Sequence, residues 1–387
     1  MTGRFRGLLG DWREWRRFNA LPRAARSIVF YAESRADWVH FEPIIEQLTG
    51  PLERTICYLT SEAADPVLQR HSARLLPFAI GSGTVCTALF KTIDADVMVL
   101  TLNDLDAYHL KRSARPVHYV YVCHTLASTH RIFRKGSLNA YDTILCSGPH
   151  HTREIRRSEE VYGVKAKRLI EHGYGRLDSL LRNHSQRAPF TPSAGDSKRV
   201  LIAPSWGKNS LAESCGSELV ERLLAAGHHT ILRPHPMTTR QHPKLIDAFV
   251  RRFGNQPLFV LETDARSEES LHTSDIMISD WSGAALEFAF GLERPVLFVD
   301  VPPKINNPEW ERIGFPALEV VLRPEIGAVV APDRLADVPA GIQRLCADLN
   351  AKTNAIRRAR AAWVYNVGTS GVVGANAVLD ALPPPHP

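Results

Sequence analysis

The chain has 387 residues, of which 44% are hydrophobic and 23% are charged, and its formal net charge is +6. This composition is typical of a globular protein, and the length leaves room for two hydrophobic cores. No apolar run reaches the roughly 18–20 residues that a membrane span requires, and no cleavable signal sequence is apparent. We therefore expect a cytoplasmic protein.

The net charge is concentrated in residues 1–26, which contain seven Arg and two acidic residues. One arc of a helix there would carry Phe5, Leu8, Leu9, Trp12 and Trp15, and another Arg6, Arg13 and Arg17. This pattern predicts an amphipathic helix that holds the protein peripherally on an anionic membrane surface, the inner face of the cell membrane. A disordered basic leader and a helix docked on the protein body are the alternatives. No basic stripe continues into the rest of the chain, so no nucleic-acid partner is expected.

Short apolar runs alternate with helical patterns along the rest of the chain. The expected strands lie at 27–33, 54–60, 96–102, 117–123, 141–147, 198–204, 229–235, 257–262, 275–280 and 295–300, and the last helices near 332–349, 354–364 and 370–382. Nearly continuous apolar strands separated by helices predict parallel sheets covered on both faces. The expected fold class is α/β, with two Rossmann-like domains that face each other across a cleft.

Residues 184–197 lack apolar periodicity and concentrate Pro, Ser, Gly and Thr, which predicts a linker. The expected organisation is a leader at 1–26, an N-terminal domain at 27–183, the linker at 184–197, a C-terminal domain at 198–364, and a helix and tail at 365–387. This last segment could pack back on the N-terminal domain.

Residues 274–300 carry the strongest functional signal, because they predict a strand, a polar turn, a helix and a second strand in succession. The turn contains Ser279, Asp280, Ser282 and Gly283. Free backbone N–H groups at the start of a helix, beside two hydroxyl groups, suit the phosphates of a nucleotide. The structural alternative is a simple N-cap at Ser282 and a turn-forming Asp280. A second predicted strand ends in Arg233-Pro234-His235-Pro236, which adds cationic side chains to the same sheet edge.

Together with two further segments, these motifs resemble the CDP-glycerol glycerophosphotransferase family, the teichoic-acid polymerase and primase group. The resemblance covers roughly residues 28–382. Two of its motifs are RPHP at 233–236 and SDWSG at 279–283, the latter followed by Glu287 and Pro295. The other two depart from the family pattern: CHT at 123–125 stands in place of Trp-His-Gly, and GYGRLD at 173–178 in place of Gly-Tyr-Pro-Arg-x-Asp. The resemblance implies a GT-B architecture with an acceptor domain followed by a nucleotide-donor domain. It also implies a CDP-alditol donor, used as a substrate, and no separate cofactor.

Transfer of a phosphoglycerol-like unit to a hydroxyl needs a base for the hydroxyl and cations or dipoles for the developing charge. We expect His124, at a strand end, to be the base, and His235 to be a donor or acid. Arg233 and the turn residues are expected to bind the donor phosphates. Glu287 is expected to accept a hydrogen bond from a ribose or sugar hydroxyl, or to form a structural pair.

A second group of candidates lies in turns or at strand ends around the same cleft: Arg176, Asp178, Lys208, Asn209, Asn306, Asn307 and Arg312. For Arg176 and Asp178, an ion pair that fixes the turn is the preferred interpretation. Asp94 and Asp96 resemble an Asp-x-Asp metal motif, but they precede a strand and should lie at the wrong sheet edge. The six cysteines show no paired metal-ligand spacing, so buried thiols and no metal site are expected.

The expected function is transfer of a glycerol-phosphate or related alditol-phosphate unit from a CDP-activated donor to a hydroxyl of a lipid-linked or polysaccharide acceptor. Such a transferase would act in the synthesis of a cell-surface polymer such as teichoic acid or capsule. The alternatives are a GT-B glycosyltransferase that uses a nucleotide sugar, a nucleotide-sugar 2-epimerase, and a non-catalytic nucleotide-binding protein. Epimerisation would require a set of acidic groups in the N-terminal half of the cleft and no acceptor.

Overall fold

The computed structural model describes residues 7–384, apart from residue 71 and residues 265–266. The strands of its first half are β1 Ile28–Ala32, β2 Ile56–Thr60, β3 Leu75–Ala79, β4 Val97–Leu100, β5 His118–Val122, β6 Thr143–Cys146 and β7 Arg168–Glu171. The strands of its second half are β8 Arg199–Ile202, β9 His229–Leu232, β10 Phe259–Leu261, β11 Ile276–Ser279, β12 Val296–Val299 and β13 Gly327–Val330.

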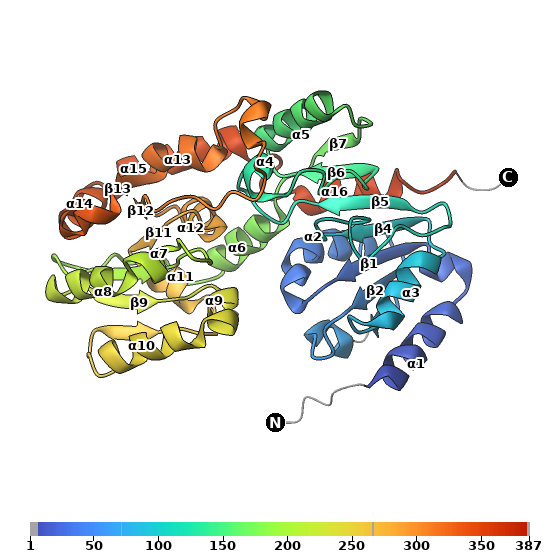
Figure 1. Ribbon diagram of the computed structural model, residues 1–387, viewed down its shortest axis with the longest axis horizontal. Helices are drawn as coiled ribbons and strands as arrows, with labels where there is room; N and C mark the ends of the chain where they lie inside the picture. The colour runs from blue at the N-terminus through green and yellow to red at the C-terminus, as the bar shows by residue number, and fades with distance from the viewer. Residues whose placement is uncertain (1–6, 71, 265–266, 385–387) are drawn as a thin grey trace.

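The helices of the first half are α1 Leu8–Asn19, α2 Trp38–Thr49, α3 Thr84–Thr92, α4 Thr129–Ile132, α5 Pro149–Tyr162 and α6 Gly175–Ser185. The later helices are α7 Leu211–Ser214, α8 Gly216–Ala225, α9 Pro236–Gln241, α10 Pro243–Phe253, α11 Glu269–Thr273, α12 Gly283–Leu292, α13 Leu318–Ile326, α14 Val338–Ala347, α15 Leu349–Trp363 and α16 Ser370–Leu379. They lie around the two sheets (Figure 1).

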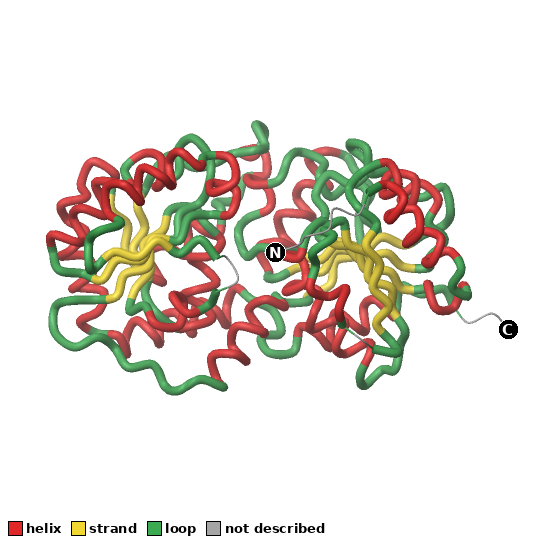
Figure 2. Tube along the Cα trace, turned by 90° about the horizontal axis from the view of Figure 1, so that it is seen from below, coloured by secondary structure: helices red, strands yellow, loops and turns green. Residues whose placement is uncertain are grey.

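Both sheets are parallel, and Figure 2 shows them side by side with helices around each. Over the described residues the strand order is β3-β2-β1-β4-β5-β6-β7 in the first sheet and β10-β9-β8-β11-β12-β13 in the second. The central strands are buried on both faces, as the apolar runs predict. The predicted class, two Rossmann-like α/β domains, is confirmed.

Each predicted strand range contains an observed strand, but three observed strands have no predicted counterpart: β3, β7 and β13. All three lie at an edge of their sheet. β3 contains Pro77, and β7 is exposed or half-buried along its whole length. Edge strands tolerate proline and polar side chains because one side of each strand forms no ladder hydrogen bonds.

The C-terminal helix α16 packs against α2 of the first half, as Figure 1 shows by its red colour beside the first sheet. Its Ala375 and Val378 join the hydrophobic core there. The contact is close, since a Cβ at Gly371 would lie 2.5 Å from Pro43 O. Asp178 fixes the start of α16, because its carboxylate accepts hydrogen bonds from Ser370 N at 2.9 Å and Ser370 Oγ at 2.6 Å.

Part of the basic leader forms α1, which lies against β3 and α3. Its Phe18 is fully buried and meets the Phe78 ring edge-on at 5.6 Å between centroids, while Trp15 packs against the same core. The helix is therefore docked on the protein body, so the predicted apolar arc is divided between the core and the surface. Leu8, Leu9 and Trp12 remain outward, with exposures of 56%, 86% and 38%. Two residues of the predicted pattern, Phe5 and Arg6, lie outside the described residues.

Candidate active site

A cavity of about 270 Å³ lies between the two halves, at the carboxyl ends of several strands. Its lining comprises Asn103, His124, Arg131, Ile132, Phe133, Ser205, Trp206, His235, Trp281, Ser282, Gly283, Pro303, Lys304, Asn306 and Glu319. We call it the cleft cavity. Ligands of open α/β sheets bind in crevices at this edge, because loops there are shaped independently of the core.

His124 follows β5 and lies in the lining of the cleft cavity. Burial lowers the pKa of His124 to about 4, so the imidazole is neutral at pH 7. Tyr121 OH donates to Asn103 Oδ1 at 2.8 Å and lies 3.0 Å from His124 Nδ1. Because the tyrosine proton is used on Asn103, Nδ1 of His124 must carry the imidazole proton and donate it to the Tyr121 oxygen. The Nε2 atom of His124 is then an acceptor, as a general base requires.

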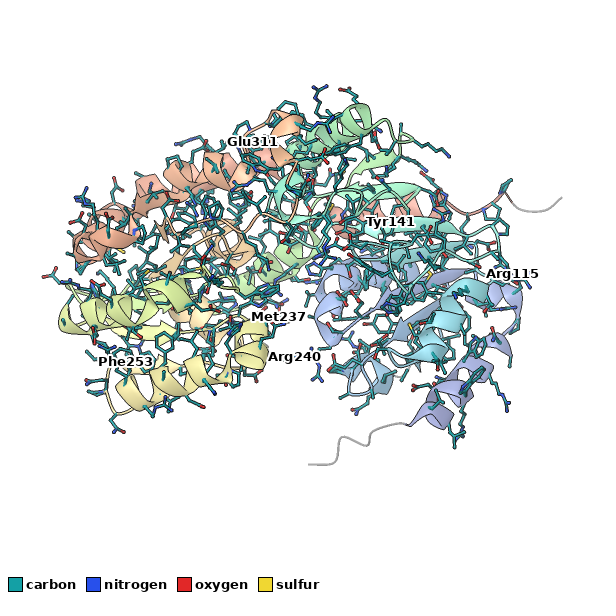
Figure 3. All side chains as sticks on the ribbon, in the orientation of Figure 1. Arg115, Tyr141, Met237, Arg240, Phe253 and Glu311 are labelled. Carbon is teal, nitrogen blue, oxygen red and sulfur yellow. The ribbon has the colours of Figure 1, made fainter. Side chains whose placement is uncertain are left out.

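His235 follows β9 and caps the short helix α9, which lies at the border of the two halves, where Figure 3 labels Met237 and Arg240. The His235 Nδ1 atom accepts a hydrogen bond from Met237 N at 3.1 Å. Burial and then the charge of Lys304 lower the pKa of His235 to about 4, so this ring is also neutral. Since Nδ1 is an acceptor, the proton lies on Nε2. His235 therefore offers a donor, whereas His124 offers an acceptor.

The polar turn after β11 divides into a buried part and a half-buried part. Ser282 and Gly283 line the cleft cavity, and Ser282 Oγ accepts a hydrogen bond from Ala284 N at 3.3 Å as the N-cap of α12. Ser279 is fully buried and donates to Ala203 O at 2.7 Å. Asp280 is also buried, and its carboxylate accepts hydrogen bonds from Ser205 N, Ser205 Oγ and Leu211 N at 2.7–2.9 Å. Thus Ser279 and Asp280 shape the turn, and Ser282 and Gly283 meet the cavity.

Arg233 also follows β9, but its side chain is not part of the lining of the cleft cavity. Its guanidinium donates to Ser267 O at 2.6 Å and forms an ion pair with Glu262 at 3.5 Å. Burial lowers the pKa of Arg233. The side chain is oriented by these partners, and a direct phosphate contact would require it to turn away from them.

Glu287 of α12 forms a pair across the two halves. Its carboxylate accepts a hydrogen bond from Tyr174 OH at 2.7 Å and from Arg176 Nε at 2.6 Å. Glu287 raises the pKa of Arg176. The predicted pairing of Arg176 with Asp178 is therefore wrong: Asp178 binds the start of α16, while Arg176 reaches the second half. This is the structural alternative for Glu287, and it ties the turn after β7 to α12 of the second half.

The remaining candidates are dispersed. Lys208 and Asn209 are exposed and do not line the cleft cavity. Asn306 lines it and donates to Ile132 O at 2.7 Å. Arg312 is exposed and pairs with Glu309 at 2.5 Å.

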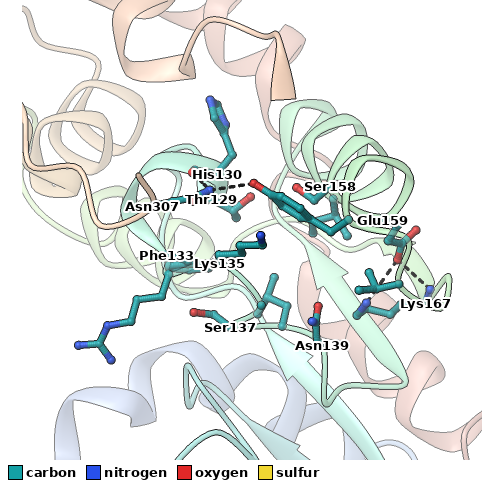
Figure 4. A pocket seen from close by; sticks show the side chains of 16 residues that line it. Thr129, His130, Phe133, Lys135, Ser137, Asn139, Ser158, Glu159, Lys167 and Asn307 are labelled. Carbon is teal, nitrogen blue, oxygen red and sulfur yellow. Dashed lines mark hydrogen bonds and ion pairs between the residues drawn. The ribbon is translucent and has the colours of Figure 1, made fainter. Parts of the chain in front are cut away.

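Asn307 lines a separate, smaller cavity of about 60 Å³ beside α5 (Figure 4). There its amide donates to His130 O at 3.0 Å and to Tyr162 OH at 3.4 Å. Figure 4 also shows Lys135, from the segment after α4, and Ser158, from α5, at this smaller cavity. The two neighbouring asparagines thus face different cavities, and both bind backbone carbonyl groups of the segment around α4.

Several lining residues have no counterpart among the candidates, notably Trp206, Trp281 and Lys304. Lys304 Nζ lies 3.1 Å from the centroid of the Trp206 ring, a cation–π geometry. Trp206 follows β8 in the same loop as Lys208, so the strand end indicates the correct loop, although Trp206 and not Lys208 lines the cleft cavity. Glu319 comes from α13, far along the chain, and accepts a hydrogen bond from Ser128 N at 3.0 Å. Nothing in the local sequence around Glu319 marks it.

Asp94 and Asp96 precede β4, and so lie at the edge opposite to the cleft cavity. Arg23 forms ion pairs with both, at 3.1 Å and 2.6 Å. Within the described residues, no group of three or more His, Cys, Asp or Glu side chains is arranged to hold a metal ion. The two aspartates therefore anchor the segment that follows α1.

Residues 122–301 match the family described as CDP-Glycerol:Poly(glycerophosphate) glycerophosphotransferase. The matched segment includes both cavity histidines and the turn after β11. No curated protein sequence matches the chain significantly.

Similar solved structures include the wall teichoic acid polymerase TagF soaked with CDPG, with 12% identity, 96% of this chain and 98% of that chain covered, and a TM-score of 0.57. They also include S. aureus MnaA with UDP, with 12% identity, 90% of this chain and 94% of that chain covered, and a TM-score of 0.59. A third is the Methanocaldococcus jannaschii UDP-GlcNAc 2-epimerase, with 13% identity, 91% of this chain and 98% of that chain covered, and a TM-score of 0.56. These likenesses are in the fold, which is GT-B-like. The family match spans residues 122–301, less than half of the chain, so over that segment the chain is similar to the CDP-glycerol glycerophosphotransferases.

Proposed function

We propose that the chain moves a glycerol-phosphate or related alditol-phosphate unit from a CDP-activated donor to a hydroxyl of a lipid-linked or polysaccharide acceptor. The observation that carries this proposal is the pair of neutral histidines at one cavity, with an acceptor on His124 Nε2 and a donor on His235 Nε2. A hydroxyl nucleophile needs the first, and the phosphate of the departing CMP, which becomes more negative as the bridging bond breaks, needs the second. The polymer would belong to the cell surface, as in teichoic acid or capsule synthesis.

In this reaction, His124 Nε2 takes the proton of the acceptor hydroxyl as its oxygen bonds to the glycerol-bearing phosphorus. The bond from that phosphorus to the bridging oxygen breaks, and its electron pair leaves with CMP. His235 Nε2–H and the hydroxyl of Ser282 donate hydrogen bonds to the phosphate oxygens, and the free N–H groups at the start of α12 favour the same negative charge. Lys304, at the rim beside Trp206, adds a positive charge.

The direct test is to incubate the purified chain with CDP-glycerol and glycerol and to measure the release of CMP. A melting-temperature panel with CDP, UDP and GDP ranks the bases independently of turnover, because a ligand of the folded state raises the melting temperature. We expect CMP release and the largest shift with CDP. Release of UDP from a UDP-sugar, without CMP release from CDP-glycerol, would instead favour the glycosyltransferase alternative.

A 2-epimerase is the second candidate, because the first half does contain acidic groups close to His124. Glu33, Asp37 and Asp104 line a neighbouring cavity that shares His124 with the cleft cavity. Incubation with UDP-GlcNAc and no acceptor tests this candidate. Formation of the 2-epimer would support epimerisation, and an unchanged sugar would support transfer.

We also propose that α1 holds the protein peripherally on the cytoplasmic face of an anionic membrane. Leu8, Leu9 and Trp12 are directed away from the protein body, and Arg13 and Arg16 on the same helix are exposed. Apolar side chains among headgroups and arginines near anionic lipid are the two components of reversible surface binding. The structure has no helix in its described part that is both long and apolar enough to cross a bilayer.

A further inference from the structure

A second cavity of about 270 Å³ lies on the other side of His124, within the first half. Its lining comprises Glu33, Asp37, Thr101, Leu102, Asn103, Asp104, Tyr108, His109, Leu110, His124 and Arg134. It shares Asn103 and His124 with the cleft cavity. We call it the inner cavity. A group in the inner cavity and a group in the cleft cavity can therefore meet at His124.

The wall of the inner cavity is built by the loop after β4. Asp104 and Asp106 adopt positive φ angles of 63° and 68°, which are uncommon for residues other than glycine. The loop is held there by hydrogen bonds from Asp104 N to Ser137 O at 3.2 Å and from Asp106 N to Leu110 O at 2.9 Å. The cavity is thus a shaped site at the carboxyl edge of β1, β4 and β5.

Two of the three carboxylates in the inner cavity already have partners. Asp104 pairs with Arg134 at 2.9 Å and accepts from Ser137 Oγ at 2.5 Å. Asp37 accepts from Ser34 N at 2.9 Å and from Thr101 Oγ1 at 2.8 Å.

The third carboxylate, Glu33, receives no side-chain hydrogen bond from the described residues, and its side chain is open to the cavity. Burial of its protein-facing side and the neighbouring Asp37 raise the pKa of Glu33 to about 7. Glu33 is therefore a hydrogen-bond acceptor for which the described residues supply no donor.

We infer that the inner cavity binds the uncharged, hydroxyl-rich end of the acceptor, a polyol or sugar unit, with Glu33 as the acceptor of one of its hydroxyl hydrogen bonds. This inference rests on the proposed transferase function. Carboxylates favour hydroxyl donors and repel a phosphate, so the terminal unit enters without a phosphate group of its own. The volume is slightly below the roughly 300–1,000 Å³ of typical small-molecule sites, which suits one unit rather than a polymer.

The inner cavity also explains how the acceptor and donor approach His124 without competing for space. A unit that hydrogen-bonds to Glu33 can place another of its hydroxyl groups at His124 Nε2. The donor phosphates then approach the same hydroxyl from the cleft cavity, beside His235 and Ser282. Asn103 separates the two sites, and its Oδ1 atom is already occupied by Tyr121.

The test compares Glu33→Gln with a charge-matched control, Glu62→Gln. Glu62 is also on the first half, but it pairs with Arg35 and does not line the inner cavity. Glutamine has nearly the same shape as glutamate, and the substitution breaks no side-chain hydrogen bond to the described residues. The variant should therefore fold, and a melting curve checks this. The probes are glycerol, a neutral polyol, and sn-glycerol 3-phosphate, its charged counterpart.

Binding is read by saturation-transfer NMR on the CDP-loaded protein, and turnover by CMP release from CDP-glycerol. The wild type should bind and use glycerol better than glycerol 3-phosphate. Glu33→Gln should raise the KM for glycerol about 10-fold, because the hydroxyl then donates to a neutral amide oxygen in place of a carboxylate, and should weaken its NMR signal. The affinity for CDP, from calorimetry, should not change, and Glu62→Gln should behave as the wild type throughout.

Equal glycerol signals in the wild type and Glu33→Gln would overturn the inference, as would a preference for glycerol 3-phosphate in both assays. Failure of the proposed function has a different signature, which is no CMP release from CDP-glycerol by the wild type with either acceptor. In that case the NMR comparison still decides whether the inner cavity binds a neutral polyol through Glu33.

Discussion

His124 and His235 present opposite hydrogen-bonding groups to the same cavity, although both are neutral imidazoles. The difference comes from their neighbours, since Tyr121 accepts from Nδ1 of His124, while Met237 N donates to Nδ1 of His235. The tautomer of each ring is thereby fixed by one hydrogen bond. A substitution at Tyr121 therefore changes the tautomer of His124, the proposed base, without removing a contact with the substrate.

The first prediction concerns His124. His124→Ala should lower the turnover of CDP-glycerol by about 10²–10⁴-fold, the usual contribution of a general base, with an unchanged affinity for CDP. Tyr121→Phe should cause a smaller loss, because the ring stays in place but its tautomer is no longer fixed. Steady-state CMP release and calorimetry measure the two quantities, and His242→Ala, at an exposed histidine, serves as the control. Full turnover by His124→Ala would exclude this residue as the base.

The second prediction is that substitutions at Ser282 and at Arg233 have different effects on CDP affinity and on stability. Ser282→Ala removes one hydrogen bond to a charged phosphate oxygen at the cleft cavity and should weaken CDP binding by about 1.5–3 kcal/mol. Arg233→Ala leaves Glu262 without its guanidinium partner in a half-buried site, so it should lower the melting temperature more than the affinity. Calorimetry and melting curves on both variants are the measurements. A large loss of CDP affinity in a stable Arg233→Ala protein would show that this side chain turns toward the nucleotide.

At the scale of elements, the sequence predicts the central strands well and the edge strands poorly. β4, a run of Val97-Met98-Val99-Leu100, is buried on both faces, so its composition reflects its environment. β7, in contrast, begins with an exposed Arg168 and ends with an exposed Glu171. Its pairing with β6 is set by the fold and not by its own side chains. The boundaries of the linker and of the two domains stay predictions.

The third prediction concerns α1, whose docking makes deletion of the leader an unsuitable test, because Phe78 would lose its cover. Substituting the outward side chains, Leu8→Ser, Leu9→Ser and Trp12→Ser together, should abolish binding to anionic liposomes and keep the fold. Added salt should weaken binding of the wild type, because the arginine contribution is screened. Val250→Ser, at an exposed apolar residue of α10, is the matched control in the same sedimentation assay. Undiminished sedimentation of the triple variant would place the membrane contact elsewhere.

At the scale of the whole molecule, the sequence predicts which strand ends bear functional side chains, but not which cavity those side chains line. Apolar runs precede His124, His235 and Ser282 and predict functional side chains there, and the structure brings all three to one cavity. Glu33 also follows an apolar run, β1, but it belongs to no recognised motif. Glu319 and Lys304 reach the cleft cavity through the packing of loops far apart in the chain, which local patterns do not encode.

The fourth prediction is a loss of stability in mild acid, caused by buried neutral histidines such as His172. Burial lowers the pKa of His172 to about 4 from 6.5, and the side chain is fully buried. Above pH 6.5 both folded and unfolded states are neutral at this site, whereas between pH 6.5 and about 4 only the unfolded state takes up the proton. The melting temperature should therefore fall as the pH decreases through this range. A His172→Gln variant should show a shallower pH dependence, and an identical slope would assign the loss to other groups.

The contact of α16 with α2 has a consequence for how the protein is made. The core of the first half is completed by Ala375 and Val378, which leave the ribosome after the rest of that core. The 184 residues between Ser185, the end of α6, and Ser370, the start of α16, take roughly 10–40 s to synthesise at about 5–20 residues per second. During that time the nascent first half exposes the apolar face of α2 that α16 will cover. A chaperone that binds this face would have its substrate only until α16 emerges and covers the face.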